Sequence, residues 1–183
     1  MDTSIWPASL GSFCDQIAAR RPAPAGVASS AVVAVLGLSL LIKTIEISGK
    51  RADLAESARG LSEKLRTAAD EDIAAVHAYM ASRDPAALRQ AIDVPMSAAR
   101  AAAAGIDLCC EAADVVRASL RADIGAAAAL LAGAVRAILI CVDANLSGPG
   151  DYGDVTKERA ELEPRVLGKA DEVVRKISTT RAS

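Results

Sequence analysis

The stretch from Ala23 to Ile42 reads APAGVASSAVVAVLGLSLLI and contains no charged residue. Proline lacks a backbone N–H and restrains the residue before it, so a helix is expected to start after Pro24. Gly49 is a natural stop for that helix, because glycine readily adopts the left-handed conformation found just after helix ends. The pattern therefore predicts a long apolar helix over residues 26–48.

This apolar stretch is about as long as a membrane-spanning helix, so membrane insertion has to be weighed against burial in a core. The stretch is rich in Ala, Ser and Gly, and Lys43 follows it at once. A second apolar stretch, Gly125 to Val142, contains Arg136. The chain also starts without a basic region followed by an apolar one, the pattern of a secretory signal. We therefore expect two core helices, no membrane and a cytoplasmic location.

The rest of the chain is helical in pattern as well. Of its 183 residues, 52% are hydrophobic but only 2% are aromatic, so Ala, Leu, Val and Ile must fill the core. Long stretches lack the alternation typical of strands. We expect one all-α domain over residues 1–183, a bundle of five to seven helices with long central ones. Capping residues and helix breakers predict the other helices at about residues 9–20, 50–82, 95–118 and 122–146, with a short helix opened by Asp84-Pro85. A last, charged helix is expected over residues 154–179, where Pro164 should kink it. Residues 180–183 should be frayed.

Charge and composition exclude several classes of partner. The net charge is -2, from 21 basic and 23 acidic residues, and there are almost no aromatic side chains on which bases could stack, so we expect no nucleic acid. Four cysteines show no paired zinc spacing, and the single histidine, His77, lies on a different helix face from Asp72. We therefore expect no metal, and cysteines that stay reduced.

Asp72 interrupts an apolar helix face. It lies four residues before Val76 and seven after Leu65, which belong to a stripe of core residues at helical spacing. A carboxylate inside a core costs on the order of several kcal/mol unless it is paired or hydrogen-bonded. Asp72 therefore either lies at the solvated margin of a wide stripe or faces a cavity. Its neighbours Asp70 and Glu71 have the pattern of solvated residues.

Asp123 and Asn145 share one face of the helix expected over residues 122–146. An acidic residue in a first turn also favours the helix dipole, so Asp123 has a purely structural interpretation. The two residues are 22 positions apart, which is about 33 Å along a straight helix. They cannot meet in one site within one chain. Either they belong to different sites, or a second copy brings them together at an interface.

Two further positions have both a structural and a binding interpretation. Gly26 opens the long apolar helix after two prolines, and free N–H groups at a helix start bind anions or carbonyl groups. Lys43 interrupts the same helix, where a lysine usually extends to the surface but can also bind an anionic ligand tail.

Several short motifs, in this order and spacing, resemble the cyclodeaminase/cyclohydrolase family of one-carbon folate enzymes. The similarity extends from about Phe13 to Leu146. The chain departs from the family pattern at Ala25 and Val27, which replace glycines, and at Cys141, which replaces an asparagine. The matching positions are Pro22, Pro24 and Gly26, the pair Gly49-Lys50, Asp70 and Asp72, Val94-Pro95-Met96, Asp123 and Gly125, and Val142, Asn145 and Leu146.

The resemblance implies a compact helical fold, a homodimer and a folate pocket near Gly26. The implied reaction is that of a methenyltetrahydrofolate cyclohydrolase, which hydrolyses the methenyl bridge to 10-formyltetrahydrofolate. Asp72 or Asp123 would stabilise the cationic substrate and take a proton from water. Lys50, or less favourably Lys43, would meet the glutamate tail. The full set of implied ligand-binding residues is Pro22, Pro24, Gly26, Lys50, Cys141 and Asn145.

Two alternatives within the same family stay open. The first is a formiminotetrahydrofolate cyclodeaminase, whose chemistry is similar but releases ammonia; the cyclohydrolase is preferred here because no transferase domain is attached. The second is a non-catalytic relative that keeps the scaffold and binds a folate or a partner protein, which the changes at Ala25, Val27 and Cys141 favour. An unrelated structural bundle is the remaining interpretation.

Overall fold

The computed structural model describes residues 4–179, and within this range it contains six α-helices and no strand. The expectation of an all-α domain is confirmed. The predicted fraying of residues 180–183 lies outside the described residues. The helices are α1 (Leu10–Ala18), α2 (Gly26–Ser48), α3 (Ala52–Ser82), α4 (Pro85–Val115), α5 (Arg121–Leu146) and α6 (Gly153–Thr179), with a short 3-10 turn, η1 (Ala118–Leu120), before α5.

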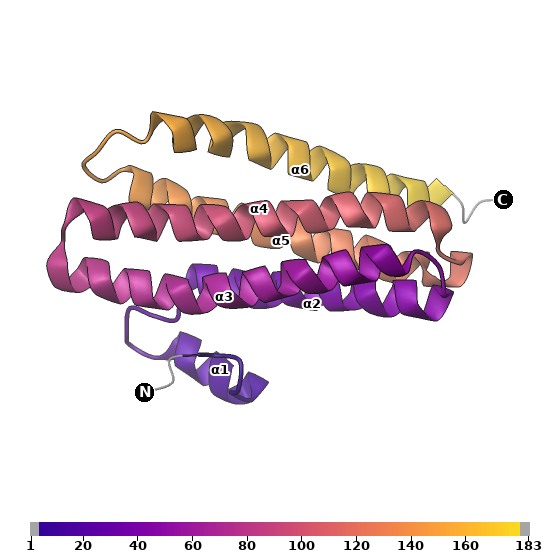
Figure 1. Ribbon diagram of the computed structural model, residues 1–183, viewed down its shortest axis with the longest axis horizontal. Coiled ribbons are helices and arrows are strands. Elements are labelled where there is room, and N and C mark those ends of the chain that lie inside the picture. Colours follow the sequence, from indigo (N-terminus) through magenta and orange to yellow (C-terminus); the bar gives the residue numbers. More distant parts are fainter. Residues whose placement is uncertain (1–3, 180–183) are drawn as a thin grey trace.

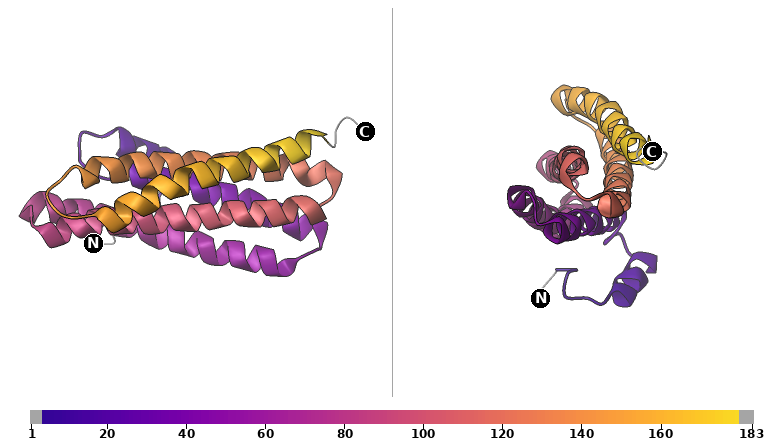
Figure 2. Two further views of the ribbon diagram at one scale, coloured as in Figure 1. Left: turned by 90° about the horizontal axis from the view of Figure 1, so that it is seen from above. Right: turned by 90° about the vertical axis from the view of Figure 1, so that its right-hand side faces the viewer.

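Four long helices, α2 to α5, form the centre of the bundle and alternate in direction (Figure 1). Each packs against the next along the chain, and α2 closes the ring against α5. The α6 helix packs on α4 and α5, while α1 lies on the opposite side of the bundle (Figures 1 and 2). The start of α2, the end of α3, the start of α4 and the end of α5 therefore lie at one end of the molecule.

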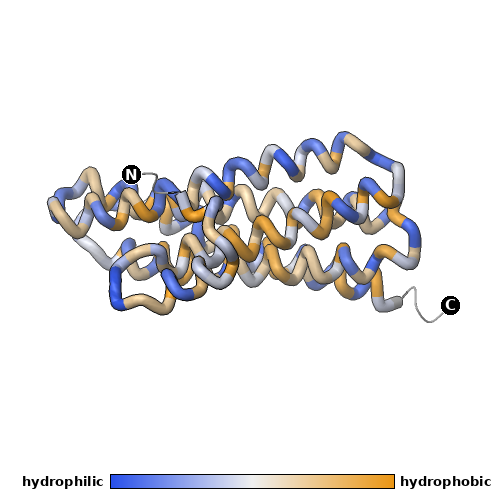
Figure 3. Tube along the Cα trace, turned by 90° about the horizontal axis from the view of Figure 1, so that it is seen from below, coloured by the Kyte–Doolittle hydropathy of each residue, from blue (hydrophilic) through white to orange (hydrophobic). Residues whose placement is uncertain are grey.

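Small residues allow the central helices to approach closely. A Cβ atom on Gly37 would lie 3.1 Å from the Ala127 backbone oxygen of α5, and one on Gly105 of α4 would lie 2.9 Å from the Leu38 side chain. Figure 3 shows the hydrophobic residues gathered along the interior helices. The core is built from Ala, Leu, Ile and Val, as the composition predicts.

Both apolar stretches form central helices. α2 and the segment Ala118–Leu146 are long and apolar enough to cross a membrane by length and composition, but half of each apolar window is buried inside the bundle. A core helix of a water-soluble bundle passes the same test. The absence of membrane association stays a prediction.

Local signals set most helix boundaries where the sequence predicts them. Gly49 adopts a left-handed conformation with φ of 67° and ends α2. The Asp84 carboxylate accepts a hydrogen bond of 2.8 Å from the Ala87 backbone N–H, and Pro85 occupies the first turn of α4, where its missing N–H costs nothing.

One boundary was predicted wrongly. We expected a short helix after Pro85 and a separate helix from Pro95, but α4 runs without interruption from Pro85 to Val115. Pro95 has no N–H for the Ala91 carbonyl, and the side-chain amide of Asn145 on α5 donates to that carbonyl instead, over 2.7 Å. Burial of Ile92, Pro95 and Met96 holds the helix together across the proline.

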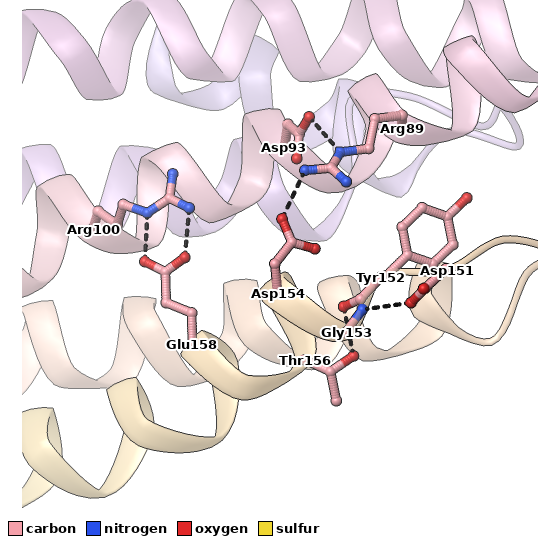
Figure 4. Close-up of polar contacts among 9 residues, drawn as sticks. All are labelled: Arg89, Asp93, Arg100, Asp151, Tyr152, Gly153, Asp154, Thr156 and Glu158. Atoms are coloured by element: carbon pink, nitrogen blue, oxygen red, sulfur yellow. Dashed lines mark hydrogen bonds and ion pairs between the residues drawn. The ribbon is translucent and has the colours of Figure 1, made fainter.

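The charged helix α6 continues through Pro164 and is attached by a thin apolar stripe and a row of ion pairs. Arg100 of α4 binds Glu158 through two hydrogen bonds of 2.6 Å each, and Arg89 bridges Asp93 and Asp154 (Figure 4). Other pairs between α6 and its two neighbours are Arg159–Asp143, Arg136–Glu163, Lys169–Asp107 and Lys176–Asp114.

Candidate active site

Asp72 of α3 is a buried carboxylate with a relative exposure of 3%. Within residues 4–179, no backbone or side-chain donor makes a hydrogen bond or ion pair with it. Burial raises the pKa of the Asp72 carboxyl from its usual 3.8 to about 6. The solvated-margin interpretation of Asp72 is therefore wrong, and its position beside a cavity stays a prediction.

Gly26 and Cys141 lie at the same end of the bundle. A Cβ atom on Gly26 would come within 2.7 Å of the Cys141 Sγ, so a side chain at residue 26 would require the Cys141 side chain to move. The pKa of the Cys141 thiol is raised, first by burial and then by the negative charge of Asp72. Helices α2, α3 and α5 thus converge on one group of residues, Gly26, Asp72 and Cys141, which we call the Asp72 cluster.

A buried carboxylate without a counter-ion is suited to a cationic ligand. Its charge is unfavourable in the low-dielectric interior until a cation or a proton neutralises it. A pKa near 6 also allows the same group to take up and release a proton close to neutral pH. Asp72 therefore has the charge that suits a cationic ligand and a pKa at which a carboxyl group exchanges its proton near neutral pH.

The segment before α2 is tied to α3 next to this cluster. The Ile5 backbone N–H donates to the Asp70 carboxylate over 3.0 Å, and the Trp6 indole N–H donates to the Arg66 backbone oxygen over 3.1 Å. The Arg66 guanidinium also lies 4.3 Å from the centre of the Trp6 ring. Asp70 was predicted to be a solvated residue. Its carboxylate instead holds the segment around Ile5 against α3. The only tryptophan in the sequence is the signal from which this contact could have been predicted.

Asp123 lies at the opposite end of the molecule. Its carboxylate accepts a hydrogen bond of 2.9 Å from Lys43 Nζ, and both side chains are partly exposed. Asp123 is 18 residues from Cys141 on the same helix, a distance of about 27 Å along the axis. Lys50 is exposed in the loop between α2 and α3, also at this far end, beside a hollow of about 500 Å³. Within one chain, the structure separates Asp123 and Lys50 from the Asp72 cluster.

Comparison with known proteins assigns this arrangement to a family. The formiminotransferase-cyclodeaminase profile matches residues 9–164, which is most of the chain. The chain belongs to the formiminotransferase-cyclodeaminase family. Its fold is similar to the crystal structure of formiminotetrahydrofolate cyclodeaminase from Thermotoga maritima, with a TM-score of 0.91, 22% sequence identity, and coverage of 96% of this chain and 98% of that one. No curated protein matches the chain. The family resemblance read from the motifs is confirmed.

The remaining predicted ligand-binding residues of this cyclodeaminase-family protein fall into two groups. Pro24 is buried and Pro22 is exposed in the turn that leads into Gly26, so both lie beside the Asp72 cluster. Asn145 lies one helical turn beyond Cys141, but its amide is already bonded to the Ala91 carbonyl.

The first turn of α2 has no side-chain cap, so its N–H groups remain available to a ligand. His77 is exposed. Among the described residues, no three His, Cys, Asp or Glu side chains gather closely enough to hold a metal ion.

Proposed function

We propose that the protein is a formiminotetrahydrofolate cyclodeaminase, which closes the formimino group of its substrate to the methenyl bridge and releases ammonia. Membership of a folate enzyme family and the likeness to a solved cyclodeaminase support this function over the cyclohydrolase preferred from the sequence. Four unpaired cysteines support a reduced, cytoplasmic setting.

The observation that carries the proposal is the isolated, buried carboxylate of Asp72. In the reaction, N10 of the folate attacks the carbon of the cationic formimino group, which forms one carbon–nitrogen bond and leaves an extra proton on N10. The amino group on the same carbon must gain a proton before its carbon–nitrogen bond breaks and ammonia departs. One group that carries a proton from N10 to this nitrogen therefore balances the reaction.

Asp72 has the properties that this transfer needs. As a carboxylate it offsets the positive charge of the formimino group, and with a pKa of about 6 it can accept the proton from N10 and return it to the leaving amine. Because Asp72 has a relative exposure of only 3%, electrostatic attraction between Asp72 and a bound cation is screened only weakly. The uncapped start of α2 at Gly26 supplies N–H donors for carbonyl groups of the substrate.

The second candidate is methenyltetrahydrofolate cyclohydrolase. The same carboxylate supports it, since a water molecule beside Asp72 could lose a proton to it while adding to the methenyl carbon. Asp72 alone does not distinguish the two reactions, because both pass through a cationic carbon between two nitrogens. The substrate that is consumed separates them.

We also propose that the protein is a homodimer through the outer faces of α2 and α5. Exposed apolar residues follow both helices, among them Leu36 and Ile140, which are 53% and 61% exposed, and the small residues Ala129 and Gly133 of α5 lie on the same exposed stripe. Large exposed apolar side chains favour association, and the exposed Lys43 and Arg136 lie among them. An antiparallel pairing of two copies would bring Asp123 of one copy toward the Asp72 cluster of the other. Sedimentation should give a dimer, and Ile140→Asp should give a monomer.

The experiment that tests the function offers the purified protein each substrate separately. With 5-formiminotetrahydrofolate, methenyl absorbance should rise while an equal amount of ammonia appears. Hydrolysis of methenyltetrahydrofolate above the uncatalysed rate, without turnover of the formimino compound, would favour the cyclohydrolase. No turnover of either compound by a folded protein would indicate the non-catalytic relative.

A further inference from the structure

Pro95 leaves one backbone carbonyl inside α4 without its usual hydrogen-bond donor. Residue 95 of an α-helix normally donates its N–H to the carbonyl of residue 91, and proline has no N–H to donate. Ala91 has a relative exposure of only 2%, and Pro95 is buried as well. Water therefore cannot easily donate a hydrogen bond to the Ala91 carbonyl. A buried carbonyl without a hydrogen-bond partner destabilises the folded state by on the order of 1–3 kcal/mol.

A side chain on another helix supplies the missing hydrogen-bond donor. The Asn145 amide of α5 donates from Nδ2 to the Ala91 oxygen over 2.7 Å. A carbonyl oxygen can only accept, so the atom that faces it must be the amide nitrogen, and the orientation of the Asn145 side chain follows from the contact itself. Asn145 is the only asparagine in the sequence.

The second proline within a helix provides a comparison. Pro164 of α6 leaves the Ala160 carbonyl without its helical donor, and both residues are exposed, so water can take the place of the lost N–H. The buried proline has a side-chain donor from a neighbouring helix, and the exposed proline does not need one. The hydrogen bond from Asn145 to Ala91 therefore replaces a donor that the buried carbonyl needs.

The same contact fixes the end of α5 against the start of α4. Three residues after Asn145, a Cβ atom on Gly148 would lie 2.8 Å from the Leu88 side chain of α4, so the chain leaving α5 also packs tightly on that helix. Four residues before Asn145 is Cys141, whose sulfur would lie 2.7 Å from a Cβ atom on Gly26 and whose thiol is close enough to Asp72 for that negative charge to raise its pKa. A displacement of this last part of α5 would move one wall of the Asp72 cluster.

We propose that Asn145 is a positioning residue, which replaces the hydrogen bond removed from α4 by Pro95 and so holds Cys141 and the end of α5 in place beside Gly26 and Asp72. The role of the cluster in catalysis rests on the proposed function, but the link between Asn145 and Pro95 does not. Its prediction is that Asn145 becomes dispensable once residue 95 can donate its own N–H.

A double-mutant cycle tests this link. In the natural background, Asn145→Ala should shift the unfolding equilibrium about 5- to 150-fold toward the unfolded state, as expected for an unsatisfied buried carbonyl. In the Pro95→Ala background the same substitution should shift it less than about threefold, because residue 95 then has a backbone N–H that bonds to the Ala91 carbonyl. Ser147→Ala is the matched control, since the Ser147 hydroxyl bonds locally to the Ala144 carbonyl and should give the same small effect in both backgrounds.

Equal losses for Asn145→Ala in the two backgrounds would overturn the proposal. If Asn145→Ala alone does not fold, recovery of folding in the double variant supports the proposal, and failure of the double variant to fold contradicts it. None of these measurements uses a folate, so their outcome does not depend on whether the proposed reaction is correct.

Thiol labelling tests whether the bond positions the cluster. Site-resolved mass spectrometry would follow the labelling rate of Cys141 against that of Cys110, which lies near the far end of α4 and is partly buried. Asn145→Ala should raise the ratio of the Cys141 rate to the Cys110 rate, and Pro95→Ala should restore it. An unchanged ratio, with both rates rising together, would mean that the bond affects only global stability and would refute the positioning role.

Discussion

The substitution Asp72→Asn should make the protein more stable at neutral pH while lowering its activity by about 10²- to 10⁴-fold. Asp72 is buried without a partner, and its pKa of about 6 lies well above the usual 3.8. The native state therefore holds the proton more tightly than the unfolded state does. The free energy of unfolding should fall as pH rises from about 4 to about 6, and the full penalty of the charge should be present at higher pH.

The size of this effect follows from the two pKa values. A pKa of about 6 against 3.8 corresponds to a penalty of about 3 kcal/mol at pH 8. Asparagine has nearly the same shape and no charge, so Asp72→Asn should recover a gain of that order at pH 8 and almost none at pH 4. Denaturant unfolding at the two pH values measures the difference.

The matched control is Glu71→Gln, one residue earlier on α3. Glu71 is exposed, so removing its charge should change the free energy of unfolding by less than about 0.5 kcal/mol at both pH values. A loss of stability in Asp72→Asn at pH 8, or the same change at pH 4 and pH 8, would refute the claim that Asp72 is an unpaired buried carboxylate.

Three further results are expected. Gly26→Ala should destabilise the protein by about 1–3 kcal/mol because the new methyl group meets the Cys141 sulfur, and Cys141→Ala should relieve much of this loss in a double-mutant cycle measured by denaturant unfolding. Asp123→Ala should cost less than about 1 kcal/mol in thermal unfolding, since its ion pair with Lys43 is partly exposed; a loss of several kcal/mol would contradict this. Glu158→Gln should weaken the attachment of α6 by about 0.5–1 kcal/mol at low salt and by less at 1 M salt, and a salt-independent loss would contradict the electrostatic account.

The fold was largely predictable because its signals are local. The apolar stretch after Pro24, the stop at Gly49 and the cap at Asp84 each act within a few residues, and the helices begin and end close to the expected positions. The break expected at Pro95 was wrong because the donor that compensates for it comes from Asn145, 50 positions later in the sequence. A rule that considers only neighbouring residues cannot find that donor.

The candidate site was predictable only in part. Helical spacing places Asp72 on the buried face of its helix, but the contact of Gly26 with Cys141 depends on how α2 and α5 pack, which the pattern does not specify. Asp123 satisfied the same spacing argument as Asp72, yet it lies at the other end of the bundle, paired with Lys43. Helical spacing thus places both acidic residues on an apolar helix face. Only the directions in which the helices run show that the two residues lie at opposite ends of the bundle.

The dependence of kcat/KM on pH for 5-formiminotetrahydrofolate tests the central claim most directly. The carboxylate form of Asp72 is the one that binds the cation and accepts the proton, so kcat/KM should rise with pH and level off above an inflection near 6, which reports the free enzyme. In Asp72→Asn, kcat/KM should fall by about 10²- to 10⁴-fold and the residual rate should lose this inflection. A wild-type profile without an inflection near 6, or an Asp72→Asn variant that keeps both the rate and the profile, would contradict the assignment of Asp72 as the catalytic carboxylate.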